Sequence, residues 1–144
     1  MIANFSREGQ TQKTKELAEG LEKAGDVIEE CRELLADLKA PVARKEVGVF
    51  IGPNSPGYNV TTESLQACSE FARETGLKMT VHVSETVHVL EDVRGRYGHA
   101  GVVDYLEEIG ILGPEVLAAH VIHVSHGEID LLASRGVSAA YNPV

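Results

Sequence analysis

The chain has 144 residues, of which 43% are apolar and 24% charged, and its formal net charge is −9. This length and composition predict one globular domain over residues 1–144, with enough apolar side chains to form a core. The 13 lysines and arginines against 22 acidic residues argue against a nucleic-acid partner, because phosphate neutralisation supplies most of that affinity.

No part of the sequence looks like a targeting or membrane segment. Residues 1–8 lack the apolar stretch of a signal peptide, and no run approaches the roughly 18 apolar residues of a membrane span. Cys31 and Cys68 are not spaced as a metal or redox motif, which is typical of buried free thiols in a reducing compartment. We therefore expect a cytoplasmic protein without a membrane partner.

The first third of the chain predicts a helical lead-in followed by a strand. Residues 10–39 carry apolar side chains at steps of three or four, which indicates one amphipathic helix or two helices broken near Gly25, and Pro41 should end it. We expect residues 1–40 to serve a packing role. Residues 46–52 predict a short strand that opens into an irregular loop at residues 53–57, where a pocket could be lined although no residue is an evident ligand.

The remaining residues alternate between helical and strand patterns. Thr61 or Thr62 can cap a helix that Gly76 ends, and Ser125 with Glu128 matches a capping box for a helix over 129–133. Helices are also predicted at 87–96 and 102–109, and strands at 78–84, 116–123 and 137–141. This alternation predicts a parallel sheet with right-handed crossovers, and four strands are too few to close an eight-stranded barrel.

Two of the predicted strands run into histidine, at His82 and at His120. The carboxyl ends of parallel strands are where active sites form. His82 and Glu85 are three residues apart at such an end, so an imidazole for a divalent cation and a carboxylate for proton transfer could enter one cavity. Taken alone, this short and common pattern favours a half-buried strand histidine at position 82. His120 follows two alanines in an apolar run, so it is either a hydrogen-bonded core residue or a site residue.

The other histidines carry weaker signals. His123 could hydrogen-bond the following loop or support His120. We expect His88, His99 and His126 on the surface, although residues 97–99 could form part of a pocket rim.

Four short elements together resemble the amidohydrolase superfamily. They are Val-His-Val-Ser-Glu-Thr at 81–86, Tyr-Gly-His at 97–99 with Val103, Tyr105, Leu106 and Gly110 after it, Leu-Ala-Ala-His-Val-Ile-His at 117–123, and Tyr-Asn-Pro at 141–143. Their order and spacing are similar to the branch of aromatic deaminases and chlorohydrolases that includes methylthioadenosine/adenosylhomocysteine deaminase. The resemblance covers residues 46–144 and implies an α/β fold, with parallel βα units forming about half of a TIM-type (β/α)8 barrel.

The resemblance also implies roles for three residues. His82 would be a ligand of a divalent metal, zinc or alternatively iron. Glu85 would shuttle a proton from metal-bound water to the substrate, and His120 would polarise that water or bind the substrate. The expected substrate is a small heterocyclic amine, and the expected reaction is hydrolysis of a C–N or C–Cl bond in a cyclic amidine or purine-like ring.

The chain departs from this family in its metal ligands. No two histidines are separated by one residue, so the His-x-His pair of the first strand is absent, as is the aspartate of the eighth strand. We therefore expect an internal fragment with little or no hydrolase activity by itself, which pairs with a second copy or with the missing remainder of the barrel. Two alternatives remain: a non-catalytic interaction module that self-associates through exposed sheet edges, and an unrelated small α/β protein with coincidental histidines.

Overall fold

The computed structural model describes residues 24–43, 50–56 and 60–142. Strands and helices alternate from β1 onward, as predicted. The elements in chain order are α2 (Ala24–Ala43), β1 (Phe50–Ile51), α3 (Thr62–Thr75), β2 (Lys78–Val83), α4 (Val87–Tyr97), α5 (Val102–Glu108), β3 (Val116–His120), α6 (His126–Ser134) and β4 (Ser138–Ala140). Most of the lead-in predicted for residues 1–40, and residues 46–49 of the first predicted strand, lie outside the described residues.

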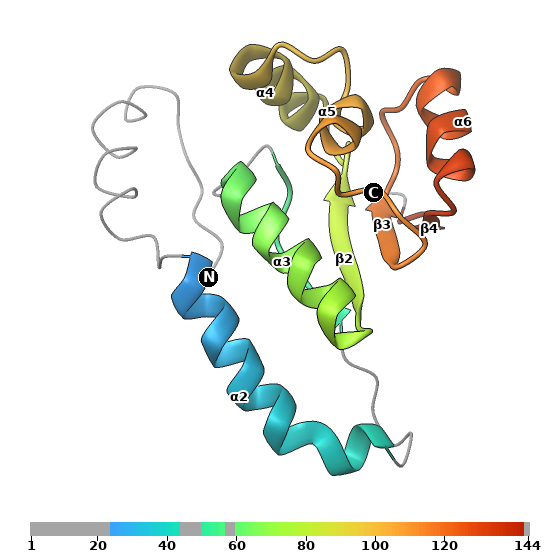
Figure 1. Cartoon of the computed structure of the whole chain (residues 1–144). Coiled ribbons are helices and arrows are strands. Elements are labelled where there is room, and N and C mark those ends of the chain that lie inside the picture. The colour runs from blue at the N-terminus through green and yellow to red at the C-terminus, as the bar shows by residue number, and fades with distance from the viewer. Residues whose placement is uncertain (1–23, 44–49, 57–59, 143–144) are drawn as a thin grey trace.

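The four strands form one parallel sheet in the order β1-β2-β3-β4 (Figure 1). β2 and β3 share the longest pairing, from Met79 opposite Val116 to Val83 opposite His120. Because all the strands are parallel, their carboxyl ends meet at one edge of the sheet. The predicted parallel arrangement of the strands is therefore confirmed.

Short-range signals end and begin the helices where the sequence predicts. The Thr61 side chain accepts a hydrogen bond from Ser64 N at the start of α3, and Gly76 ends this helix with φ at 70°. The left-handed backbone conformation costs little free energy at that position, because glycine has no Cβ. Ser125 and Glu128 form the predicted capping box of α6, with both reciprocal hydrogen bonds present.

The core lies between the sheet and the helices that cover one of its faces. In β2, Met79, Val81 and Val83 are buried, whereas Thr80 and His82 between them are only half-buried. Leu65 and Phe71 of α3 are fully buried in the same core. The other face of the sheet is thus the less covered one, and it carries His82.

α2 lies beside α3, on the side of the molecule away from α6 (Figure 1). Cys31 of α2 and Cys68 of α3 are free thiols that pack partly buried against the core. Burial raises the pKa of Cys68, and the neighbouring Cys31 adds to this rise. Both cysteines are thus unpaired, as predicted, although neither is fully buried. No helix among the described residues is long and apolar enough to cross a lipid bilayer.

Three predicted boundaries were wrong. α6 begins at His126 instead of residue 129, because its N-cap Ser125 lets the helix start at the next residue. α2 does not end at Pro41 but continues to Ala43, a difference of two residues that lies within the range over which helix ends fray. The third strand ends at His120 instead of His123, because positive φ values at His120 and Val121 take the chain out of the extended conformation there.

Candidate functional site

His82 and His120 lie on neighbouring strands at the same edge of the sheet. Their ring centroids are 5.2 Å apart, with the planes inclined by 63°. In the strand register, however, His120 is opposite Val83, while His82 is opposite Ala119. Paired residues of parallel strands share a face, so a regular β3 would direct His120 to the helix-covered face.

The backbone at the strand end changes this direction. His120 has φ at 75°, Val121 at 53°, and Ser84, at the end of β2, at 49°. These are left-handed conformations, which are costly for residues with a Cβ and above all for a β-branched valine. The three left-handed residues thus lie at the carboxyl ends of β2 and β3. The two imidazole rings are in contact at the same place.

Glu85 joins this pair through His120 rather than through His82. Its Oε2 lies 3.3 Å from His120 Nε2, and the two side chains are only 15% and 22% exposed. His120 Nδ1 lies 3.4 Å from the carbonyl oxygen of Asn142, beyond the end of β4. The sequence grouped Glu85 with His82 by their spacing, whereas the structure places the carboxylate against the imidazole of the next strand.

Asn54 is a neighbour of His82 that the sequence did not single out. It lies in the loop after β1, and its Oδ1 is 3.2 Å from His82 Nδ1. The same oxygen accepts a hydrogen bond of 2.8 Å from Ser55 N. The signal that could have found it is its position after a strand end, beside the strand that carries His82.

Backbone hydrogen bonds hold the loops after β2 and β3 together. Val121 N donates to Val83 O at 3.0 Å, and His123 N donates to Ser84 O at 3.0 Å. The hydroxyl oxygens of Ser55 and Ser84 are buried without a hydrogen-bond partner near these strand ends. Unpartnered buried polar atoms are uncommon in proteins. We call His82, Glu85, His120 and Asn54 the strand-end cluster.

The described residues do not by themselves form a metal centre. No group of three or more histidine, cysteine, aspartate or glutamate side chains lies together in residues 24–43, 50–56 and 60–142 as a cation would require. Protein metal sites use at least three such ligands. A cation held by His82 would therefore need further donors from elsewhere.

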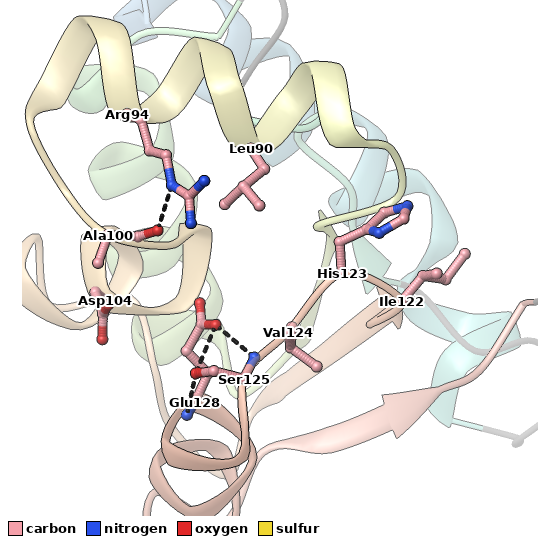
Figure 2. A pocket seen from close by; sticks show the side chains of 9 residues that line it. All are labelled: Leu90, Arg94, Ala100, Asp104, Ile122, His123, Val124, Ser125 and Glu128. Carbon is pink, nitrogen blue, oxygen red and sulfur yellow. Dashed lines mark hydrogen bonds between the residues drawn. The ribbon is translucent and has the colours of Figure 1, made fainter.

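A pocket of about 480 Å³ lies between α4, α5 and the segment before α6. Figure 2 shows Leu90 and Arg94 projecting from α4, with Arg94 pointing to Ala100, and Glu128 bonded to Ser125 below them. Arg94 Nε donates to Ala100 O at 2.7 Å. None of His82, Glu85 and His120 lines this pocket.

Of the remaining histidines, three are exposed and one is not. His88, His123 and His126 are exposed, and His123 lines the pocket. His99 is half-buried, so its predicted surface position was wrong: its ring lies 5.6 Å from that of Tyr105, and its Nε2 is 3.4 Å from Glu108. Residues 97–99 pack onto α5 and do not line the pocket.

Comparison with known proteins assigns nearly the whole chain to one protein family. The model of the amidohydrolase family matches residues 4–142. The chain is 33% identical over 130 residues to a 5'-deoxyadenosine deaminase of Methanothermobacter thermautotrophicus, covering 90% of this chain and 28% of that protein. It is 36% identical over 97 residues to 5-methylthioadenosine/S-adenosylhomocysteine deaminase 2 of Archaeoglobus fulgidus, covering 67% of this chain and 23% of that protein.

A solved structure shows the same fold. The atrazine chlorohydrolase TrzN of Arthrobacter aurescens, crystallised with zinc, superposes with a TM-score of 0.72 and 21% identity over 84% of this chain and 26% of that chain. The chain thus spans about a quarter of the length of the proteins it matches. This agrees with the predicted set of parallel βα units from a TIM-type barrel.

These comparisons decide between the alternatives that the sequence left open. A family match over residues 4–142 contradicts an unrelated α/β protein with coincidental histidines. The relatives named above are deaminases and a chlorohydrolase, which does not support a non-catalytic interaction module. The chain belongs to the amidohydrolase family.

Proposed function

We propose that this chain contributes part of the active site of a metal-dependent amidohydrolase that releases an amine or a halide from a purine-like or cyclic amidine ring. The observation that carries the proposal is the strand-end cluster: two imidazoles with ring centroids 5.2 Å apart, and a carboxylate 3.3 Å from one of them. The relatives named for deamination of adenosine derivatives support the substrate class, a small heterocyclic amine.

In this proposal His82 is one ligand of a divalent metal, with zinc preferred over iron. A single imidazole cannot hold a catalytic cation, since such sites have three or more protein ligands. The other ligands would come from the rest of a barrel or from a second chain. We therefore propose that residues 1–144 act as one unit that needs this complement, and that the isolated chain has little or no hydrolase activity.

Glu85 and His120 would handle protons and substrate. A carboxylate within hydrogen-bonding reach of an imidazole orients the ring and can exchange a proton with it. Glu85 would deliver a proton to the substrate ring, and His120 would bind the substrate or polarise the attacking water. Their low exposure supports these roles, because charge interactions are stronger where water is largely excluded.

A hybrid enzyme tests the proposal. The matching segment of the Methanothermobacter thermautotrophicus deaminase would be replaced by residues of this chain, and deamination of 5'-deoxyadenosine would be measured. We expect turnover by the hybrid and none by the isolated chain. Glu85→Gln should lower kcat about 10²- to 10⁴-fold, the usual contribution of a positioned acid or base, and His82→Ala should abolish turnover.

His88→Ala is the matched control, since this imidazole is 94% exposed and lies outside the cluster. It should leave kcat and KM unchanged. A folded hybrid without activity would contradict the proposal, as would an active hybrid that is indifferent to His82→Ala. Steady turnover by the isolated chain would show that no complement is needed.

A further inference from the structure

The contact between Asn54 and His82 determines which nitrogen of His82 carries the hydrogen. The first step concerns the amide of Asn54. Ser55 N is a hydrogen-bond donor, and the Asn54 atom 2.8 Å from it must therefore be the carbonyl oxygen. That hydrogen bond fixes the orientation of the amide group, which the positions of its heavy atoms alone would not.

The second step concerns the imidazole. Asn54 Oδ1 has no hydrogen to give, so the hydrogen between it and His82 Nδ1, 3.2 Å away, must be on the nitrogen. A neutral imidazole has one N–H, which leaves Nε2 with its lone pair. The amide oxygen has two lone pairs, one for Ser55 N and one for His82, so its hydrogen-bonding capacity is fully used.

We propose that Asn54 is a positioning residue that holds His82 as its Nδ1–H tautomer and keeps the Nε2 lone pair available as a donor atom. This inference rests on the proposed function only in assigning that lone pair to a metal. Ligating histidines commonly have their second nitrogen fixed in this way, by a hydrogen bond to an oxygen acceptor. The sequence signal for Asn54 is limited to its position in the loop after a strand end.

The tautomer can be read directly from the nitrogen chemical shifts of the histidine ring. The whole chain would be labelled with ¹⁵N, and long-range ¹H–¹⁵N spectra would be recorded about two pH units above the ordinary imidazole pKa of about 6.5. We expect His82 to show a protonated Nδ1 and a bare Nε2. A bare Nδ1 in the wild-type chain would overturn the inference without any variant.

Two variants of Asn54 separate positioning from general structure. Asn54→Leu removes the acceptor and should shift His82 toward the Nε2–H form, whereas Asn54→Asp keeps an acceptor oxygen and should retain the Nδ1–H form. The exposed His88 should keep the same shifts throughout. An unchanged His82 tautomer in a folded Asn54→Leu variant would contradict the role of Asn54.

The hybrid enzyme supplies a second readout. There, Asn54→Leu should weaken zinc affinity about 10- to 100-fold, the usual effect of losing an outer hydrogen-bond partner, and Asn54→Asp should restore it. The two proposals fail in different ways. An inactive hybrid with the Nδ1–H tautomer intact would defeat the proposed function alone, whereas the wrong tautomer in an active hybrid would defeat the inference about Asn54 alone.

Discussion

Glu128 links two helices through their N-terminal backbone, and its removal should destabilise the fold measurably. Its Oε2 accepts hydrogen bonds from Ser125 N at 2.8 Å and from Ser125 Oγ at 3.0 Å, and its Oε1 accepts one from Val103 N at 3.2 Å. Only 6% of the residue is exposed. The carboxylate therefore closes the capping box of α6 and also satisfies a buried N–H in the first turn of α5.

The size of the effect follows from these contacts. Losing a capping interaction costs about 1 kcal/mol, and a buried N–H left without a partner costs about 1–3 kcal/mol. Glu128→Ala should therefore lower the free energy of unfolding by about 2–4 kcal/mol. Glu128→Gln keeps only one oxygen, with an NH₂ group facing the other donors, so its loss should be about half as large.

Urea unfolding of the chain followed by circular dichroism measures this loss. We expect a lower midpoint with an unchanged m-value, and faster amide hydrogen exchange at Val103. Asp130→Ala is the matched control, because Asp130 is an exposed acid on the same helix. If the stability of Glu128→Ala stayed within about 0.5 kcal/mol of wild type, as for a surface substitution, the reasoning would be refuted.

Three further predictions concern stability. Burial raises the pKa of Tyr105 to about 12, so its neutral phenol contributes to the free energy of unfolding. This contribution is complete below the ordinary pKa of about 10. It is lost as the pH rises from 10 to 12, by at most about 2.7 kcal/mol. Stability curves against pH should lose this decline in Tyr105→Phe but keep it in Tyr141→Phe, whose side chain is 68% exposed. A Cβ on Gly101 would lie 2.0 Å from Glu128 Oε1, so Gly101→Ala should cost about as much as Glu128→Ala, and the double variant should cost no more than either alone. Additive losses in a double-mutant cycle would contradict that steric reason. Gly95 lies inside α4, where an added Cβ would meet nothing within 4 Å, so Gly95→Ala should raise the unfolding free energy by about 0.5–1 kcal/mol, and a lower melting temperature would speak against this.

Much of the fold was predictable because its signals are local. The cap at Thr61, the glycine at 76 and the capping box at Ser125 involve residues three or four apart, or a single backbone conformation. The alternation of strand and helix predicted a parallel sheet, and the parallel sheet predicted that His82 and His120 reach the same edge. The sequence could not show that α2 continues two residues past Pro41, since no single local signal sets the exact end of a helix.

The candidate site was only partly predictable, since its contacts join residues far apart in the chain. Spacing paired Glu85 with His82, but the structure places its carboxylate beside His120, 3.3 Å away. A regular strand would have turned His120 to the opposite face, and no propensity rule predicts a left-handed histidine followed by a left-handed valine. Such conformations persist only where the surrounding structure holds them.

The amino-acid sequence alone determined the elements, their parallel arrangement, the charge and the family resemblance, because these depend on periodicity, capping and motif spacing along the chain. The tertiary structure determined which side chains contact one another. Asn54 meets His82 across 28 residues, and Glu128 meets Val103 N across 25. Each contact requires two loops or helices to be packed in place first, so its chemistry exists only once the sheet has assembled.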